Sequence, residues 1–232
     1  MNHGTHSEAL WRKIRLAEGR LWSASDQFWR HTELPGLLPR FFVQLHGIMH
    51  ASLPLMASAR ECALRLKGDE TAEITACYLE GHIREEEQHE EWLLQDLGEI
   101  GFDREEVLRE VPGAGVASLV GAQYFWSNQC HPVAIFGYLA VLEGYPPLTS
   151  QLKEIQGRAG FPAEAFRCLT THAEDDPEHL ADINRTLDKM PLTLEQSKLI
   201  ALSAFHTIDA VAAIFEQLVA IGPHREWRAT HA

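Results

Sequence analysis

The chain has 232 residues, of which 45% are hydrophobic and 23% are charged, and its formal net charge is −13. These values are ordinary for a globular domain and exclude a disordered, collagen-like or low-complexity chain. The acidic excess argues against a partner such as nucleic acid or an anionic membrane surface. We therefore expect a single domain over residues 1–232, with its core over about residues 7–221.

Compartment signals are few. No stretch of about 18 apolar residues is evident, so no transmembrane helix is expected. The N-terminus lacks the basic and apolar regions of a signal peptide, so none is expected. The four cysteines are far apart, form no Cys-x-x-Cys pair and are predicted to be reduced core residues; they are Cys62, Cys77, Cys130 and Cys168. This pattern favours a cytoplasmic protein.

Apolar residues recur with a period near 3.6 along almost the whole chain, and no window alternates with period 2. The pattern predicts an all-α bundle of about seven helices. The first follows the stripe from Leu10 to Phe28 and ends at Leu34-Pro35-Gly36. The others are expected over residues 41–66 with a kink at Pro54, 69–97, 103–111, 116–143 with a break at 131–132, 162–189 and 193–221. Residues 98–115 and 144–161 are expected to be the long connections.

Ionisable side chains interrupt two apolar stripes that should face the core. The first stripe reads Ile74, Tyr78, His82, Glu86, His89 and Leu93. The second, some ninety residues later, reads Leu169, His172, Asp176, His179, Ile183 and Leu187. Between them, Phe136, Ala140 and Glu143 place one carboxylate on the inward face of a third helix. The remaining acids near the first stripe are expected to form a solvated surface: Glu85, Glu87, Glu90 and Glu91.

Buried charges cost several kcal/mol each unless they are paired or bind a metal. Histidine and carboxylate side chains that face inward from several helices of a bundle are typical of dimetal carboxylate sites. Imidazole and carboxylate ligands suit iron or manganese, and the lack of clustered cysteines argues against a thiolate site. A single inward histidine is usually a satisfied core residue, so the prediction depends on the three segments occurring together.

Other histidines give weaker signals. His46 and His50 form an i, i+4 pair, but the apolar stripe of their helix passes through Leu45 and Ile48. His206 and Asp209 flank the last helix and are candidates for contacts with the metal ligands.

The combination resembles the haem-oxygenase-like di-iron oxidases and oxygenases, which share a fold with thiaminase II and pyrroloquinoline-quinone synthase. The resemblance covers about residues 40–220. It rests on Glu86-x-x-His89, on the segment Gly137-Tyr138-Leu139-Ala140-Val141-Leu142-Glu143-Gly144, and on His172-x3-Asp176-x2-His179. It implies a single-domain haem-oxygenase-like helical bundle.

The resemblance also implies the ligands. One iron would be held by His89, Glu143 and His172, and Glu86 would bridge to a second iron completed by Asp176 and His179. Some members take the first carboxylate one turn earlier, where this chain has His82. Glu86 is favoured because a carboxylate can bridge two cations, and His82 is kept as an extra or alternative ligand.

Pro177 directly follows Asp176 and removes the backbone hydrogen bond to the carbonyl of residue 173, which weakens the helix between the ligands of the second iron. This position predicts a looser second site. Family members are known for such a labile ligand helix, so the residue and the resemblance agree.

The implied activity is that of a non-haem di-iron enzyme with two Fe(II) per chain and O2 as co-substrate. Its small organic substrate would be an amine, an amino acid or a fatty acid, oxidised by N-oxygenation, oxidative decarboxylation or C–C cleavage. An external electron donor is a possible partner, and the family resemblance alone suggests a homodimer.

Three alternatives are open. A metal-free, thiaminase-II-like hydrolase of the same fold would need a nucleophile such as Cys130 or Cys77, or an acid pair. A haem-binding oxygenase would need an axial ligand such as His31 or His46. A non-catalytic helical module would need an exposed apolar groove instead of charges on core stripes.

Overall fold

The computed structural model describes residues 4–222, and these residues form eleven α-helices and two short 3-10 helices, with no β-strand among them. The prediction of an all-α fold is therefore confirmed. In chain order the elements are α1 (His6–Ala17), α2 (Gly19–Trp29), α3 (Leu34–Arg65), α4 (Glu70–Glu86), α5 (His89–Glu99), α6 (Arg104–Arg109), α7 (Ala114–Gln129), η1 (Pro132–Ala134), α8 (Ile135–Leu142), α9 (Thr149–Ala159), η2 (Ala163–Phe166), α10 (Arg167–Lys189) and α11 (Leu194–Ile221).

The helix count exceeds seven by four, because α1 and α2, α4 and α5, and α7 and α8 each replace one expected helix, and because α9 lies in an expected connection. The first stripe is split between α1 and α2 at Glu18. The segment Leu34-Pro35-Gly36 begins α3 instead of ending a helix, since proline is well tolerated in a first helical turn. The expected connection over 144–161 contains α9, which ends at Gly160 in the left-handed conformation typical of a helix end.

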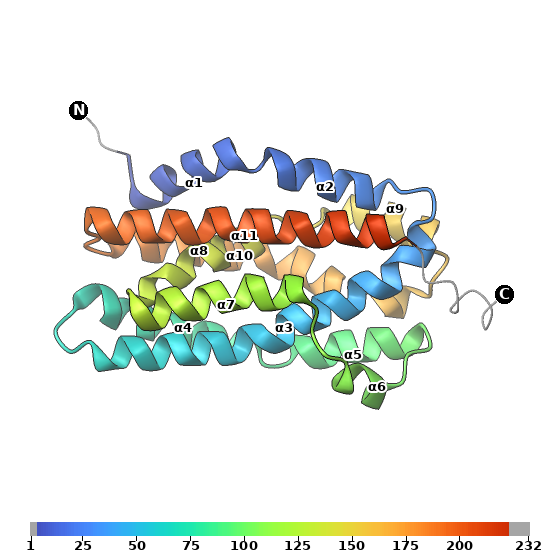
Figure 1. Cartoon of the computed structure of the whole chain (residues 1–232), viewed down its shortest axis with the longest axis horizontal. Helices are drawn as coiled ribbons and strands as arrows, with labels where there is room; N and C mark the ends of the chain where they lie inside the picture. Colours follow the sequence, from blue (N-terminus) through green and yellow to red (C-terminus); the bar gives the residue numbers. More distant parts are fainter. Residues whose placement is uncertain (1–3, 223–232) are drawn as a thin grey trace.

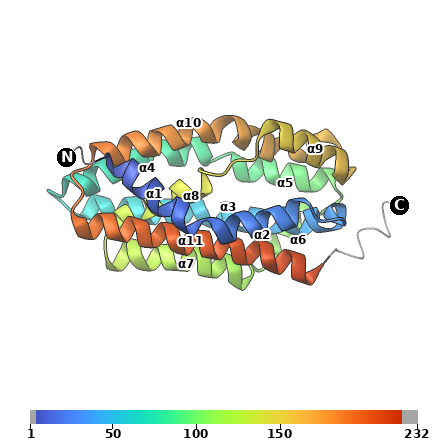
Figure 2. The same cartoon turned by 90° about the horizontal axis from the view of Figure 1, so that it is seen from above.

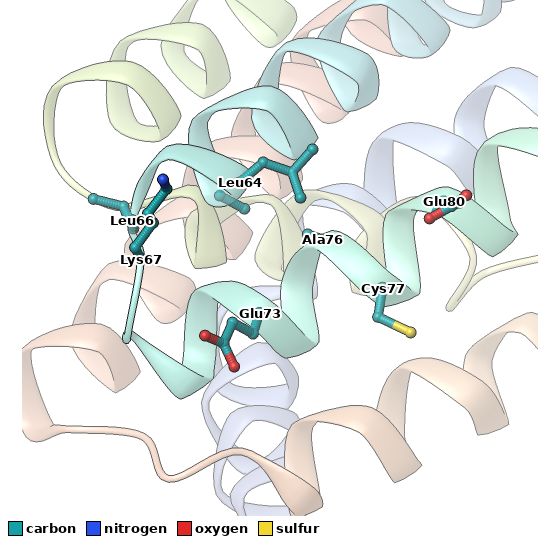
Figure 3. A pocket seen from close by; sticks show the side chains of 8 residues that line it. Leu64, Leu66, Lys67, Glu73, Ala76, Cys77 and Glu80 are labelled. Carbon is teal, nitrogen blue, oxygen red and sulfur yellow. The ribbon is translucent and has the colours of Figure 1, made fainter.

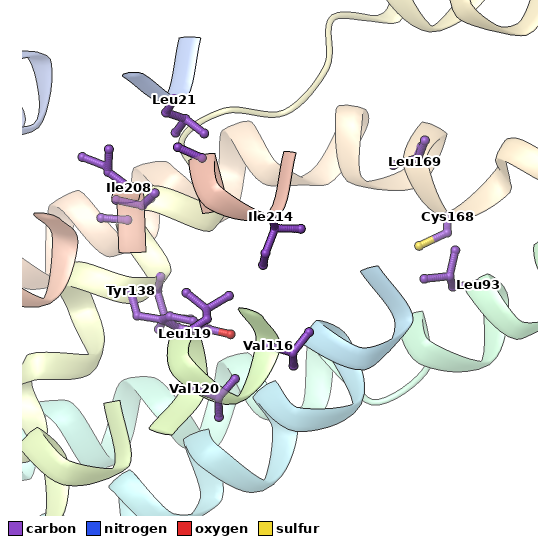
Figure 4. Close-up of a cluster of buried hydrophobic side chains, with 14 of the residues drawn as sticks. Leu21, Leu93, Val116, Leu119, Val120, Tyr138, Cys168, Leu169, Ile208 and Ile214 are labelled. Atoms are coloured by element: carbon purple, nitrogen blue, oxygen red, sulfur yellow. The ribbon is translucent and has the colours of Figure 1, made fainter. Parts of the chain in front are cut away.

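The helices pack around α11, which runs along the length of the bundle (Figure 1). This helix contacts α8, α2, α7 and α1, while α3 packs against α4, α7 and α5. Figure 2 shows α10 on the side of the bundle opposite α7, and α10 contacts α1, α5, α8 and α9. The core that these contacts enclose is almost entirely aliphatic and aromatic, with Leu119, Ile208 and Ile214 among its members (Figure 4).

Helix α8 approaches α11 very closely at Gly137. A Cβ atom at this position would lie 2.1 Å from the backbone oxygen of Ile200 and 2.6 Å from the backbone nitrogen of Ala204. Because real Cβ atoms do not approach backbone atoms so closely, only glycine permits this packing. The contact fixes the position of α8, and therefore of Glu143, which follows its last residue.

Two further predictions can be compared with the structure. Helix α11 is apolar and long enough to cross a membrane by length and composition alone, although half of the window that meets this test is buried inside the fold.

All four cysteines are free, but only Cys62 and Cys168 are buried as predicted. Cys77 and Cys130 are exposed, because Cys77 lies on an outer face of α4 and Cys130 follows the last residue of α7.

Candidate metal centre

The structure brings all six predicted metal ligands, and His82 with them, into one cluster inside the bundle. His82 and Glu86 come from α4, His89 from the start of α5, and Glu143 from the end of α8. The other three, His172, Asp176 and His179, come from α10. The donor atoms of these side chains form overlapping groups of three within 4.8 Å of one another.

One group consists of Glu86, His89 and His172. The Oε2 atom of Glu86 lies 2.9 Å from Nδ1 of His89. The His89 ring meets the His172 ring edge-on, with 4.7 Å between centroids and 81° between planes. This end of the cluster therefore offers two imidazoles and one carboxylate.

The other group consists of Glu143, Asp176 and His179. The Oε2 atom of Glu143 lies 3.3 Å from Nδ1 of His179, and its Oε1 atom lies 3.4 Å from Nε2 of His82. Glu143 therefore contacts His82 and His179, whereas the resemblance placed it on one iron with His89 and His172; which iron it would bind stays a prediction.

Glu86 connects the two groups. While Oε2 contacts His89, Oε1 lies 3.6 Å from Nδ1 of His179. Glu86 also forms a third group with His82 and Glu143. A carboxylate whose two oxygens point toward different donor groups has the geometry that a bridge between two cations requires.

Two buried atoms in the cluster, Nε2 of His82 and Oε1 of Glu86, have no hydrogen-bond partner. Only 3% of His82 is exposed, so the ring is shielded from bulk solvent. Burying a polar atom without a partner costs about 1–3 kcal/mol. A cation that accepts both lone pairs would remove this cost, so the donor set fits a bound metal.

The local chain differs from the prediction at one point. The helix expected over 69–97 is broken, because α4 ends at Glu86 and α5 begins at His89. Glu86 and His89 are thus not neighbours on one continuous helix. They meet across a two-residue junction, Glu87-Gln88, and the first helical residue of α5 still faces the core with 4% exposure.

The charges of the cluster shift the pKa values of its members. The hydrogen bond with Glu143 raises the pKa of His179 to about 9, while burial raises the pKa of Asp176 to about 6. Burial opposes the charged forms of His172, Glu86 and Glu143. Nevertheless, hydrogen bonds to their partners raise the pKa of His172 and lower those of both glutamates. The carboxylates thus stabilise positive charge at this position.

Comparison with known proteins identifies a family for this chain. The sequence profile of a family described as iron-containing redox enzymes matches residues 38–224. The chain belongs to the family of iron-containing redox enzymes. No curated protein matches the chain.

Solved structures show the same fold. A domain of unknown function with a haem-oxygenase-like fold from Shewanella denitrificans OS217 is similar with a TM-score of 0.73 and 20% identity, covering 97% of this chain and 93% of that one. A TenA homologue from Pseudomonas syringae pv. tomato DC3000 is similar with a TM-score of 0.69 and 13% identity, covering 92% of each chain. The haem-oxygenase-like fold of this iron-containing redox enzyme is thus confirmed.

In this family member, Asp96 joins two helices that carry ligands. Asp96 lies on α5 and is 1% exposed, and its Oδ2 atom accepts a hydrogen bond of 2.8 Å from the backbone N–H of Cys168. Cys168 is in the first turn of α10, where backbone N–H groups have no partner within the helix. The residue before α10, Phe166, makes no capping bond with its side chain. Asp96 therefore caps α10 from α5 and fixes His89 relative to His172.

Burial raises the pKa of Asp96 to about 6. Since the folded state holds this proton more tightly, the contribution of Asp96 to the free energy of unfolding is greatest below pH ~4 and is lost as the pH rises to about 6. We expect Asp96→Asn, which keeps an acceptor for Cys168, to be at least as stable as the wild type at pH 7. Urea unfolding between pH ~4 and ~6 should show that the free energy of unfolding of the wild type, relative to that of Asp96→Asn, falls as the pH rises. A difference that does not change with pH would contradict this expectation. Asp96→Ala should lose about 1–3 kcal/mol at pH 5.

Sequence reasoning missed two residues beside the cluster. Glu85 was predicted to be surface, and its side chain is 57% exposed, yet Oε2 lies 3.8 Å from His82 and 3.9 Å from His179. Tyr78 stacks on His82 with 5.4 Å between ring centroids, and its hydroxyl is buried without a partner. Burial and the nearby carboxylates raise the pKa of Tyr78, so its phenol stays protonated. Because Tyr78 lies on the same stripe as His82 and Glu86, the sequence could have predicted that it borders the cluster.

The structure places two other candidates elsewhere. His206 contacts the backbone oxygen of Ser118 and packs on Trp126. Asp209 pairs with Arg20 at 3.3 Å on the surface. The contacts of these two residues are therefore with Ser118, Trp126 and Arg20 and not with the candidate ligands.

Two of the residues named for the alternative functions, Cys77 and His31, do not join the donor groups of the cluster. Cys77 lines an open groove of about 330 Å³ between the end of α3 and α4, with Lys67, Glu73 and Glu80 nearby (Figure 3). The Nδ1 atom of His31 accepts a hydrogen bond from the backbone N–H of Glu33.

Pro177 lies inside α10, which continues through it from Arg167 to Lys189. The proline has no N–H to donate to the backbone carbonyl of Ala173, so one helical hydrogen bond is missing just before His179, yet the helix continues. That the second metal position is the looser one stays a prediction.

Proposed function

We propose that this iron-containing redox enzyme is a non-haem di-iron oxidase or oxygenase that uses O2 to oxidise a small organic substrate. One observation carries the proposal: two groups of imidazole and carboxylate donors, linked by Glu86, lie inside the bundle with two buried lone pairs that lack partners. Glu86, His89 and His172 would hold one Fe(II). Glu143, Asp176 and His179 would hold the other, with His82 as an additional donor.

Two ferrous ions would supply Lewis acidity and two electrons for the reduction of O2. Insertion of one oxygen atom into a substrate consumes two electrons in addition to those of the substrate, so an external electron donor belongs to the proposal. The chain holds the ligands in place through the surrounding helices and excludes water by burying His82 and Glu143, which are 3% and 7% exposed. The Tyr78 ring stacks on His82 and keeps its phenol protonated beside the cluster.

The proposal is tested by O2 consumption of the Fe(II)-loaded chain with amines, amino acids and fatty acids as substrates. We expect one of these classes to accelerate O2 uptake, with one product formed per O2 consumed. If the chain takes up no iron, a metal-free hydrolase of the same fold becomes the favoured function, and the thiols of Cys77 and Cys130 would be tested next.

His82 offers a graded test of the same centre. Replacing His82 with alanine should weaken Fe(II) binding about 10- to 100-fold at the position shared with Glu143, because it removes one donor among four. The position shared with His89 should bind as in the wild type. Anaerobic Fe(II) titration of the variant measures both affinities, and unchanged binding at both positions would show that His82 is not a ligand.

A further inference from the structure

A second cluster of metal-ligating side chains lies between α3 and α5, outside the central cluster. His46 and His50 are one turn apart on α3, and their rings are nearly parallel, with 5.9 Å between centroids. Glu90, in the first turn of α5, reaches both: its Oε1 atom lies 2.8 Å from Nδ1 of His50 and 3.3 Å from Nε2 of His46. Helix α3 supplies no donor to the central cluster.

His46 is buried and incompletely satisfied. Its side chain is 7% exposed, and Nε2 makes no hydrogen bond of acceptable geometry even though the Glu90 oxygen is 3.3 Å away. Burial lowers the pKa of His46, so the ring is neutral at pH 7. A neutral imidazole lone pair and a carboxylate oxygen that face each other repel unless a proton or a cation lies between them.

We propose that His46, His50 and Glu90 bind one borderline divalent cation such as Zn²⁺, at a site separate from the central cluster. Two histidines at i and i+4 on one helical face can chelate one ion. A set of two imidazoles and a carboxylate suits zinc and leaves a fourth position open to water.

Binding at this site requires the His50 side chain to move, because the donor atoms of the three side chains do not all lie within 4.8 Å of one another. The buried His46 and the 21%-exposed Glu90 are held by the packing of α3 on α5. The His50 side chain is 60% exposed, so its ring can turn toward the other two. The ion would connect α3 to the first turn of α5, directly beside His89.

The experiment is equilibrium dialysis of the full chain against Zn²⁺, followed by counting bound metal per chain. We expect His50→Ala and Glu90→Gln each to bind one ion fewer than the wild type, or to bind that ion at least about tenfold more weakly. Two matched controls, His206→Ala and Glu87→Gln, remove a helix histidine and an exposed neighbouring glutamate and should bind as the wild type does. Circular dichroism of each variant checks that the fold is intact.

The same comparison in a His172→Ala background separates this site from the central one. The one-ion difference between chains with and without the His50→Ala substitution should persist there, even if the central cluster binds no iron in any chain. The proposal is overturned if His50→Ala and Glu90→Gln bind Zn²⁺ as the wild type does. It is equally overturned if their deficit disappears once His172 is replaced.

Discussion

Glu86→Ala should lower the iron content of the chain from two ions to fewer than one, under conditions that saturate the wild type. Glu86 is the only carboxylate in the group with His89 and His172, and its Oε1 atom also lies 3.6 Å from His179. Its loss removes the bridge between the two positions and leaves His89 and His172 with Asp176 as the nearby carboxylate, whose Oδ1 atom lies 2.9 Å from Nδ1 of His172. We expect O2 consumption to fall at least about 100-fold, since losses of 10- to 100-fold already follow from changes to residues that only support ligands.

Variants at single positions should separate the two irons. His172→Ala should lose the iron shared with His89, and Asp176→Ala should chiefly impair the one shared with His179. Glu87→Ala is the matched control, because Glu87 is an exposed glutamate one residue away and should keep both ions. Metal analysis after anaerobic loading measures all four variants, and two ions retained by Glu86→Ala would show that Glu86 is not the bridge.

The second large effect concerns the support of the centre. We expect Gly137→Ala to lose at least about 3 kcal/mol of the free energy of unfolding, because the new Cβ would lie 2.1 Å from the backbone oxygen of Ile200. Since backbone of two helices cannot yield as a flexible side chain can, α8 must move away from α11 and carry Glu143 with it. Iron binding should therefore weaken as stability falls.

Gly121→Ala is the matched control, because Gly121 lies inside α7 with no heavy atom within 4 Å of the Cβ position. Alanine has the higher helix propensity, so this variant should gain up to about 1 kcal/mol. Urea unfolding of both variants tests the pair. Equal stabilities would mean that α8 and α11 are not in close contact at Gly137.

The periodicity of the sequence predicted correctly which side chains face inward, although the single helix expected over residues 69–97 is in fact two helices. His82, Glu86 and His89 all reach the cluster, because the junction after Glu86 is short enough to keep the inward face of α5 in line with that of α4. Periodicity depends on local spacing, which a break of two residues does not erase.

The sequence alone could not predict which of the candidate ligands contact one another. Spacing along α10 says that His172, Asp176 and His179 share a face, but the rotation of α8 against α10 decides which of them Glu143 meets. That rotation depends on the close contact at Gly137, which involves backbone atoms of α11. The contact of Glu90 with His46 and His50 was also missed, because it joins residues about forty positions apart and depends on how α5 packs against α3.

The measurement that tests the di-iron centre most directly is anaerobic titration of the metal-free chain with Fe(II), followed by exposure to O2. The account predicts saturation at two irons per chain, and oxidation of the bound iron with consumption of O2. Saturation at one iron, or no binding at all, would contradict a centre built on the two donor groups that Glu86 joins.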